Sequence, residues 1–283
     1  MAEGARHPGD GSRRRGLVMI YVRSLIFNIA FYAVLIALLV LGLPLLLTTR
    51  AAIFRLARLW GFASLWLLDK ICHLSVEFRG LDRIPQGGFI IAPKHQSIWD
   101  TFALLTKFED FTFVLKRELT YIPLFGWYCL KAEQIAIDRS KKSAALAEVA
   151  RRAAFVLKQG RQIFIFPEGT RRPAGAPPVY KFGISYVYAQ TGARCLPVAL
   201  NSGLFWPRRS FVRRPGKILV EFLDPIEPGL DKADFLALLR DRLEAATARL
   251  IEESVAADPS LRLVLPRDRS AAESRARRSD RFP

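Results

Sequence analysis

The stretch Gly88-Phe-Ile-Ile-Ala-Pro-Lys-His-Gln-Ser-Ile-Trp-Asp100 predicts a β-strand that leads directly into a helix. The apolar run at 88–92 has the length of a buried strand, and Ser97 carries a hydroxyl of the kind that favours a helix N-terminal cap. His95 is therefore expected at the carboxyl end of a strand, where α/β folds commonly hold ligands. Asp100 follows five residues later and is close enough in sequence to fold back onto the imidazole ring.

A hydrogen bond from His95 to Asp100 would fix the tautomer of the imidazole and make its other nitrogen a general base. A structural alternative assigns Ser97 to the helix cap and Asp100 to the capping box, with His95 merely preceding them. The chain has three histidines, and the other two lie in the basic N-terminal segment (His7) and beside the apolar segment (His73). If a histidine is catalytic, the sequence points to His95.

The second informative motif is Phe166-Pro-Glu-Gly-Thr-Arg171, which also follows a predicted strand. It supplies a carboxylate (Glu168), a flexible backbone (Gly169), a hydroxyl (Thr170) and a guanidinium (Arg171). Arginine binds phosphate through two parallel hydrogen bonds, and glycine lets a ligand approach the backbone closely. The alternative is a strand-to-turn connection with a solvated charge pair. The presence of both motifs in one chain favours a shared site.

The residues around these motifs alternate short apolar runs with helical patterns, which predicts an α/β fold in a single catalytic domain at 74–257. The predicted strands lie at 75–78, 88–92, 111–115, 162–166, 196–200 and 218–222. One long helix is expected from a cap at Ser140 to about residue 159, and another at 232–253. Both helices have apolar positions at helical spacing and are expected to be scaffold.

The N-terminal part of the chain predicts a membrane anchor at 17–73, preceded by a flexible basic arm at 1–16. The run at 17–47 is almost wholly apolar and long enough to cross a bilayer, and a second helix is expected at 50–73. Arginines flank the run on both sides, so the positive-inside rule gives little orientation. A single span and a two-helix hairpin that dips into one leaflet both remain open. Residues 258–283 predict a basic, disordered tail.

Composition limits the possible partners of the chain. A formal net charge of +17, a pI of about 10.3 and 51% hydrophobic residues predict a folded, strongly basic protein. Nucleic acid is not expected, because no zinc-finger spacing, RNP-like motif or basic region with heptads is present. Anionic membrane lipids and anionic substrates fit the charge better. The three cysteines are far apart and odd in number, so neither a disulfide framework nor a zinc site is expected, and the catalytic domain is predicted to face the reducing cytoplasm.

The two motifs together resemble those of the glycerophospholipid acyltransferase family, in particular its 1-acyl-glycerol-3-phosphate acyltransferases. The His-x₄-Asp block at 95–100 and the Phe-Pro-Glu-Gly-Thr-Arg block at 166–171 stand in the family's order. Weaker matches are found at 116–126, 137–139 and 196–199, so the resemblance covers about residues 75–225. The chain departs from the family at Lys94, where many members have asparagine, and at 133–136.

The resemblance implies a mixed sheet flanked by helices and an enzyme that acylates lysophosphatidate to phosphatidate in phospholipid biosynthesis. His95 would deprotonate the sn-2 hydroxyl and Asp100 would orient His95. The residues implied to bind the substrate are Lys116, Arg139, Glu168, Gly169, Thr170 and Arg171. The acyl donor would be acyl-CoA or acyl carrier protein, with no other cofactor and no metal.

Two alternatives to this function remain open. One is an acyltransferase with a different acceptor, such as glycerol 3-phosphate, another lysophospholipid or an aminoacyl lipid. The other is a catalytically silent membrane protein that holds a phospholipid phosphate. A serine hydrolase is not expected, because the chain has no Gly-x-Ser-x-Gly elbow.

Overall fold

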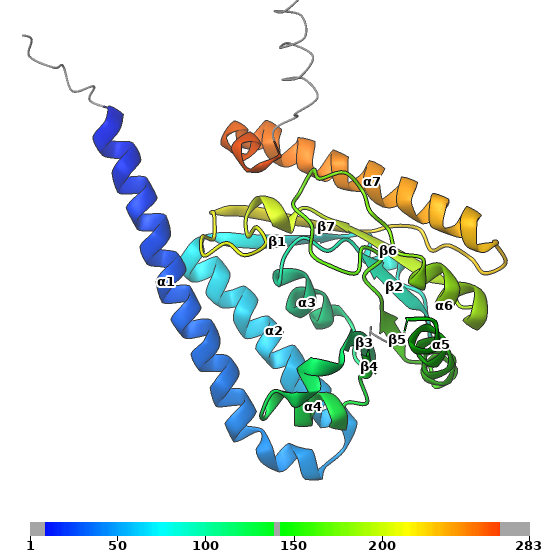
Figure 1. Ribbon diagram of the computed structural model, residues 1–283. Coiled ribbons are helices and arrows are strands. Elements are labelled where there is room, and N and C mark those ends of the chain that lie inside the picture. The colour runs from blue at the N-terminus through cyan, green and yellow to red at the C-terminus, as the bar shows by residue number, and fades with distance from the viewer. Residues whose placement is uncertain (1–8, 139–141, 267–283) are drawn as a thin grey trace, which may run out of the picture.

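The computed structural model describes residues 9–138 and 142–266, and its centre is a seven-stranded sheet (Figure 1). The strand order across the sheet is β1-β7-β6-β2-β5-β3-β4. The strands are β1 (Leu74–Arg79), β2 (Ile90–Pro93), β3 (Phe111–Lys116), β4 (Ile135–Ile137), β5 (Gln162–Phe164), β6 (Cys195–Leu200) and β7 (Gly216–Phe222).

The sheet is mixed, as predicted. Strand β2 pairs in parallel with β5 and β6, and β3 pairs in parallel with β5 and β4. Strand β7 pairs in parallel with β1 but runs antiparallel to β6. The carboxyl ends of five strands therefore lie side by side at one end of the sheet, which we call the strand edge. These strands are β6, β2, β5, β3 and β4.

Helices cover both faces of the sheet (Figure 1). The helices are α1 (Gly9–Leu41), α2 (Arg50–Cys72), α3 (Trp99–Leu104), α4 (Phe125–Lys131), α5 (Lys142–Lys158), α6 (Gly183–Thr191) and α7 (Lys232–Ala257). The short 3₁₀ helices are η1 (Leu43–Leu47), η2 (Leu81–Arg83), η3 (Leu105–Lys107), η4 (Arg117–Tyr121), η6 (Ser202–Leu204) and η7 (Pro259–Val264).

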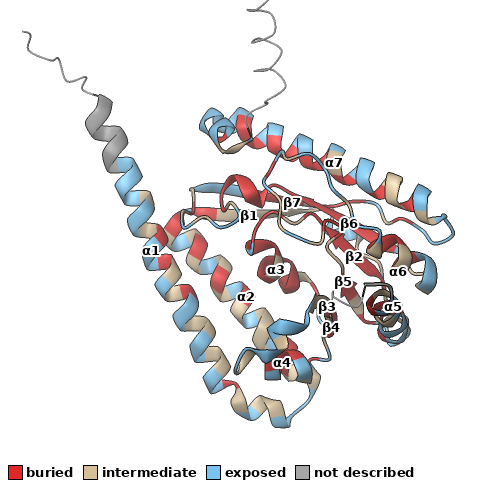
Figure 2. Cartoon of the chain, viewed as in Figure 1, coloured by how far each residue is buried: buried red, intermediate tan, exposed pale blue. Residues whose placement is uncertain are grey.

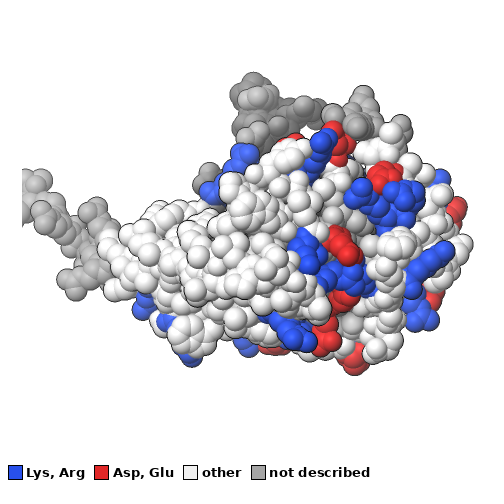
Figure 3. Space-filling view, turned by 90° about the horizontal axis from the view of Figure 1, so that it is seen from below, with Lys and Arg blue, Asp and Glu red and all other residues white. Residues whose placement is uncertain are grey.

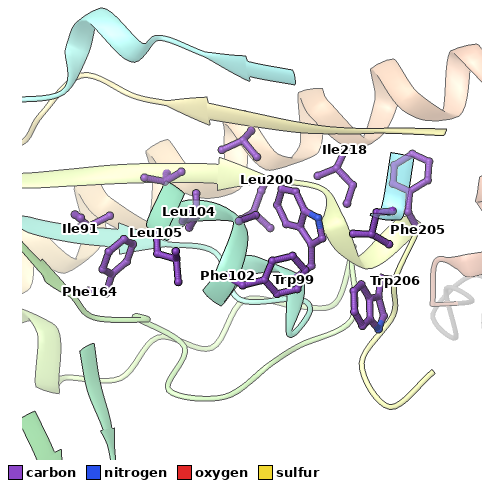
Figure 4. Packing of buried hydrophobic residues seen from close by; sticks show 14 of the residues in the cluster. Ile91, Trp99, Phe102, Leu104, Leu105, Phe164, Leu200, Phe205, Trp206 and Ile218 are labelled. Atoms are coloured by element: carbon purple, nitrogen blue, oxygen red, sulfur yellow. The ribbon is translucent and has the colours of Figure 1, made fainter. Parts of the chain in front are cut away.

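Alternate residues of each central strand enter two separate hydrophobic cores, as the period of two in a pleated strand requires. Ile91 and Phe164 join the core with α2 and α3, where Trp99 and Phe102 fill the space below the sheet (Figure 4). Their neighbours Ile90 and Ile163 enter the core beneath α5, α6 and α7. Because the strands are buried on both faces, they read in the sequence as continuous apolar runs.

Helices α1 and α2 form an antiparallel hairpin joined by η1, where Pro44 begins the turn (Figure 1). The segments Gly16–Leu41 and Arg50–Cys72 are long and apolar enough to cross a membrane, with mean hydropathies of 2.6 and 1.3. Helix α2 nevertheless buries Ile53, Phe54 and Leu68 in the core of the catalytic domain, while much of the outer surface of α1 is exposed (Figure 2).

The polar residues that interrupt the apolar run of α1 face the catalytic domain. The hydroxyl of Ser24 accepts a hydrogen bond from the Arg213 backbone N–H at 2.9 Å, and the Asn28 side chain accepts one from the Arg213 guanidinium at 2.8 Å. The same guanidinium lies 3.9 Å from the centroid of the Trp206 ring. These contacts attach α1 to the loop before β7, so the hairpin is fixed to the domain on both of its helices.

The structure differs from the sequence-based expectations at several boundaries. Helix α1 begins at Gly9, inside the predicted flexible arm at 1–16, and η7 continues the ordered chain into the predicted tail at 258–283. Leu261 of η7 is buried, and the Asp258 side chain accepts a hydrogen bond from Ser260, which explains this order. Strand β4 and helices α4 and α6 were not predicted, because each is short. The predicted cap Ser140 lies outside the described residues.

Candidate functional site

The predicted site residues lie at the edge where the parallel strands end. His95 follows β2, the segment 166–171 follows β5, and Lys116 is the last residue of β3. Strand β5 lies between β2 and β3 in the sheet, so these three chain segments are neighbours along the edge. Arg139, which the resemblance implied to bind the substrate, lies outside the described residues.

Asp100 is fully buried and accepts four hydrogen bonds. Its Oδ2 atom accepts from His95 Nδ1 at 3.1 Å and from the backbone N–H groups of Gln96 and Ser97 at 2.7 and 2.9 Å. Its Oδ1 atom accepts from the hydroxyl of Ser202 at 2.5 Å. These four donors fix the position of the Asp100 carboxylate beside the imidazole ring.

This contact assigns the tautomer of His95. A carboxylate only accepts hydrogen bonds, so Nδ1 must carry the proton, and Nε2 is left with a free lone pair. Nε2 is thereby prepared to take a proton from a substrate, and Asp100 stabilises the imidazolium that results. The His95 side chain is 14% exposed, which leaves it accessible at the surface of the site.

The two sequence interpretations of Asp100 are compatible. The N-cap of α3 is Ile98 and not the predicted Ser97, but Asp100 still accepts from the Ser97 N–H as a capping-box residue does, and Ser97 Oγ accepts from the Trp99 N–H. The same carboxylate also holds the imidazole. The short helix α3 is thus the element that positions Asp100 for His95.

Phe166 fixes the plane of the imidazole. Its ring stacks on that of His95 with 3.9 Å between centroids and an interplanar angle of 24°. Just after the second motif, the backbone N–H of Arg172 donates to the His95 carbonyl at 2.8 Å. The two motifs are therefore in direct contact through both ring and backbone.

Glu168 is buried and does not form the solvated charge pair that the alternative interpretation of this motif required. Its Oε2 atom accepts from the backbone N–H of His95 at 3.0 Å, and its Oε1 atom forms an ion pair of 2.8 Å with Lys94 Nζ. Glu168 thus holds the backbone that carries His95. It joins the two motifs, and its role in this structure is one of positioning.

Lys94 bridges two carboxylates. Besides Glu168, its Nζ contacts Glu244 of α7 at 2.7 Å, and Glu244 also accepts from the Tyr180 hydroxyl at 2.8 Å. Burial raises the pKa of Tyr180 well above its usual range, and the adjacent Glu244 carboxylate raises it further, so the phenol remains a donor. This network connects α7 to the backbone of the site.

The remaining predicted residues lie in less enclosed positions. Gly169 has a φ of 65°, a conformation that glycine adopts without the strain of a side chain, and Thr170 is exposed. The Arg171 carbonyl accepts from the Arg208 guanidinium at 3.0 Å, and the Arg171 side chain is partly exposed. Lys116 is exposed at the end of β3. The role of Lys116 in substrate binding stays a prediction.

Sequence reasoning missed several residues of the site. Ser202 and Glu244 are more than 100 residues from Asp100 and Lys94 in the chain, and nothing in their local sequence indicates a contact. Gln96 Oε1 accepts from the Gly203 N–H at 2.9 Å and closes the site near Ser202. Phe166 stood inside a recognised motif, but its ring was not assigned a role. In the described part of the chain, no group of three or more His, Cys, Asp or Glu side chains is arranged to hold a metal ion.

Replacing Ser202 with alanine is expected to lower kcat by about tenfold or more, because one hydrogen bond to a carboxylate contributes about 1.5–3 kcal/mol and three other donors still hold Asp100 in place. The KM for the acceptor should change little. The matched control is Ser185→Ala, which removes a buried hydroxyl bonded to a backbone carbonyl in α6. A Ser202→Ala enzyme with the kcat of the Ser185→Ala control would contradict a role for Ser202 in holding Asp100.

The carboxyl ends of the parallel strands carry a histidine that is oriented by a carboxylate, and an arginine-containing loop lies beside it. This arrangement suits a group transfer that begins with general-base catalysis. The family model described as Acyltransferase matches residues 75–201, the part of the chain that contains both motifs. The chain is 37% identical over 194 residues to the 1-acyl-sn-glycerol-3-phosphate acyltransferase of Pseudomonas aeruginosa, which covers 69% of this chain and 76% of that protein. The chain therefore belongs to the acyltransferase family that includes this protein.

Two further comparisons agree with this result. A chloroplastic 1-acyl-sn-glycerol-3-phosphate acyltransferase of Arabidopsis thaliana is 29% identical over 233 residues, which are 80% of this chain and 62% of the relative. The crystal structure of the 1-acyl-sn-glycerophosphate acyltransferase PlsC from Thermotoga maritima has a TM-score of 0.69 and covers 81% of this chain and 96% of its own. At 21% sequence identity, that likeness supports the fold.

Proposed function

We propose that this protein transfers a fatty acyl group from a thioester donor to the sn-2 hydroxyl of lysophosphatidate and so forms phosphatidate. The observation that carries the proposal is the buried Asp100 carboxylate on Nδ1 of His95, which leaves Nε2 as a base at the strand edge. The names of the relatives support the same acceptor.

The proposed reaction is a direct transfer. His95 Nε2 takes the proton of the sn-2 hydroxyl as its oxygen attacks the thioester carbonyl, and a tetrahedral intermediate forms. The carbon–sulfur bond then breaks, and the thiolate takes the proton from the imidazolium of His95. No acyl-enzyme is required, because the hydroxyl of the acceptor is itself the nucleophile. Asp100 stabilises the charged imidazolium between the two proton transfers.

The acceptor phosphate is proposed to bind beside the loop after β5. Arg171 is the guanidinium of this loop, Gly169 permits close backbone approach, and Thr170 adds an exposed hydroxyl. Lys116 lies along the same strand edge, and Arg139 follows β4 in the sequence. Basic side chains at the ends of β3 and β5 would then face the phosphate.

The donor is proposed to be acyl-CoA or acyl carrier protein, since both are anionic and the chain has a formal net charge of +17. The hairpin of α1 and α2 supports membrane association. We place the catalytic domain on the cytoplasmic side. The free thiols of Cys72, Cys129 and Cys195 are compatible with a reducing compartment.

The proposal is tested by product formation from purified protein in mixed micelles with a radiolabelled acyl-CoA or acyl carrier protein donor. Lysophosphatidate is offered together with competing lysolipids, an aminoacyl lipid and glycerol 3-phosphate. Selective formation of phosphatidate is the expected result. Acylation of another acceptor alone would show that the protein catalyses the same acyl transfer to a different acceptor. The absence of turnover with either donor would favour a binding protein and overturn the proposal.

Replacing Arg171 with alanine is expected to raise the KM for lysophosphatidate by about 10- to 100-fold, because charged hydrogen bonds to a phosphate contribute about 1.5–3 kcal/mol. The KM for the donor should change far less. Initial rates with each substrate varied in turn measure both constants. Arg194→Ala serves as the control, since Arg194 precedes β6 at its amino end, away from the carboxyl ends of the strands, and forms an exposed ion pair with Glu227. Equal losses for acceptor and donor would contradict the assignment of Arg171.

A further inference from the structure

Five large apolar side chains are exposed on the segment that follows β3. They are Leu119 (38% exposed), Tyr121 (63%), Ile122 (46%), Trp127 (52%) and Leu130 (63%). We call these five residues the η4–α4 surface. Globular proteins rarely leave apolar residues of this size together on one short segment unless the segment meets a partner or a membrane.

The η4–α4 surface is built on a tightly packed support. A side chain at Gly126 would place its Cβ atom 2.0 Å from the Thr120 carbonyl oxygen, so only glycine allows α4 to pack this closely on η4. Between them, Leu124 has φ 63° and ψ −64°, and the Phe125 N–H donates to the Pro123 carbonyl at 2.7 Å. This is the geometry of a γ-turn, which is uncommon and persists only where the surroundings enforce it. The exposed side chains are therefore held in place.

The same segment is attached to the turn of the α1–α2 hairpin. The hydroxyl of Tyr128 in α4 donates to the Leu39 carbonyl of α1 at 2.7 Å. Two residues after the end of α4, Glu133 forms an ion pair of 2.6 Å with Arg50 at the start of α2. At this end of the hairpin, Leu41 and Leu47 are 77% and 90% exposed. The η4–α4 surface and the exposed leucines of the turn thus lie at the same end of the molecule (Figure 1).

The side chains at this end of the molecule indicate a membrane as the partner. Seen from below, the molecule shows a broad face on the side of the hairpin that is almost free of charged side chains (Figure 3). Tryptophan and tyrosine favour the membrane–water interface, because their rings are apolar and each retains a polar group. Lys116 and Lys131 flank the segment and can contact anionic headgroups.

We propose that the η4–α4 surface is a second membrane-binding element, which inserts its apolar side chains into the same leaflet as the turn of the hairpin. Helix α4 has seven residues and is far too short to span a bilayer, so it would lie in the interface. Because η4 directly follows Lys116, this contact places the end of β3 next to the lipid headgroups. The edge of the sheet that carries the site would then face the membrane surface, from which a lipid acceptor arrives.

The proposal is tested with a fluorescent label at two positions that are matched in exposure. Leu130→Cys carries the label on the η4–α4 surface, and Phe155→Cys carries it on α5, on the other face of the sheet. The side chains of Leu130 and Phe155 are 63% and 64% exposed. Cys72, Cys129 and Cys195 are buried, so the unsubstituted protein serves as the labelling blank. Each protein is reconstituted into vesicles of phosphatidylcholine and phosphatidylglycerol with and without bromine on the acyl chains.

The label at position 130 is expected to lose fluorescence in brominated vesicles and to be protected from aqueous iodide. The label at position 155 should show neither effect. Equal iodide quenching at both positions, with no effect of bromine, would overturn the proposal. Iodide protection at position 130 without bromine quenching would also overturn it, since that result would indicate a protein partner. These measurements require no turnover, so they are independent of the proposed reaction.

Discussion

Replacing His95 with glutamine is expected to lower kcat by about 10²- to 10⁴-fold, the usual contribution of a positioned general base. Of the two ring nitrogens of His95, Nδ1 donates to Asp100, so Nε2 keeps a free lone pair beside the strand edge. Glutamine retains hydrogen-bonding groups of similar reach but cannot accept a proton at neutral pH. The loss should therefore appear in the chemical step.

The measurement is the initial rate of phosphatidate formation at saturating acceptor and donor, together with lipid binding by the same variant. Binding of lysophosphatidate should remain close to that of the unsubstituted protein, since the phosphate is assigned to other residues. The control is His73→Asn. His73 ends α2 with a φ of 52°, a conformation that asparagine tolerates, so this change should leave kcat unaltered. A His95→Gln protein that retains more than about a tenth of the activity would remove His95 from the mechanism.

Replacing Lys94 with methionine is expected to destabilise the fold by about 3 kcal/mol or more, because it leaves the buried Glu168 carboxylate without a compensating charge. The side chains of Lys94 and Glu168 are only 5% and 1% exposed, and Glu244 would lose the same partner. In a domain of this size the thermal midpoint should fall by about 6–12 °C. The kcat should also fall, because Glu168 holds the backbone of His95.

Thermal unfolding in detergent micelles and initial rates measure the two effects. Lys217→Met is the matched control, since Lys217 forms an ion pair of 3.0 Å with Glu77 in which the two side chains are 57% and 38% exposed. Pairs of this kind contribute about 0–1 kcal/mol, so its midpoint should move by no more than about 4 °C. The double variant Lys94→Met with Glu168→Gln should recover part of the lost stability, because it removes the unpaired charge. A Lys94→Met protein as stable as the Lys217→Met control would contradict the importance of this network.

The sequence predicted the strands and motifs of the sheet edge because these features are local. A buried parallel strand has a continuous apolar run in the sequence. His95 and Asp100 are only five residues apart, and the start of one short helix brings them into contact. The predicted contact between them, the mixed sheet and the two N-terminal apolar helices all agree with the structure. The short elements β4 and α6 have too few residues to show a period.

The contacts that complete the site are distant in sequence. Ser202 reaches Asp100 because β6 pairs with β2, and Glu244 reaches Lys94 because α7 packs across the sheet. A single sequence carries no record of such pairings, since serine and glutamate are common in turns and helices. Lys94 was noted as a departure from the family, yet its two carboxylate partners became visible only once the fold brought them together.

The burial of α2 in the core bears on how this protein is made and on how it can be divided. Ile53, Phe54 and Leu68 are buried in the core beneath the sheet, and burying side chains of this size contributes about 1.5–3 kcal/mol each. The hairpin is therefore not an interchangeable module, and a fragment cut after Cys72 would expose one face of its own core. Because α1 and α2 precede every strand of the sheet in the chain, the hairpin is synthesised before the strands that pack against α2.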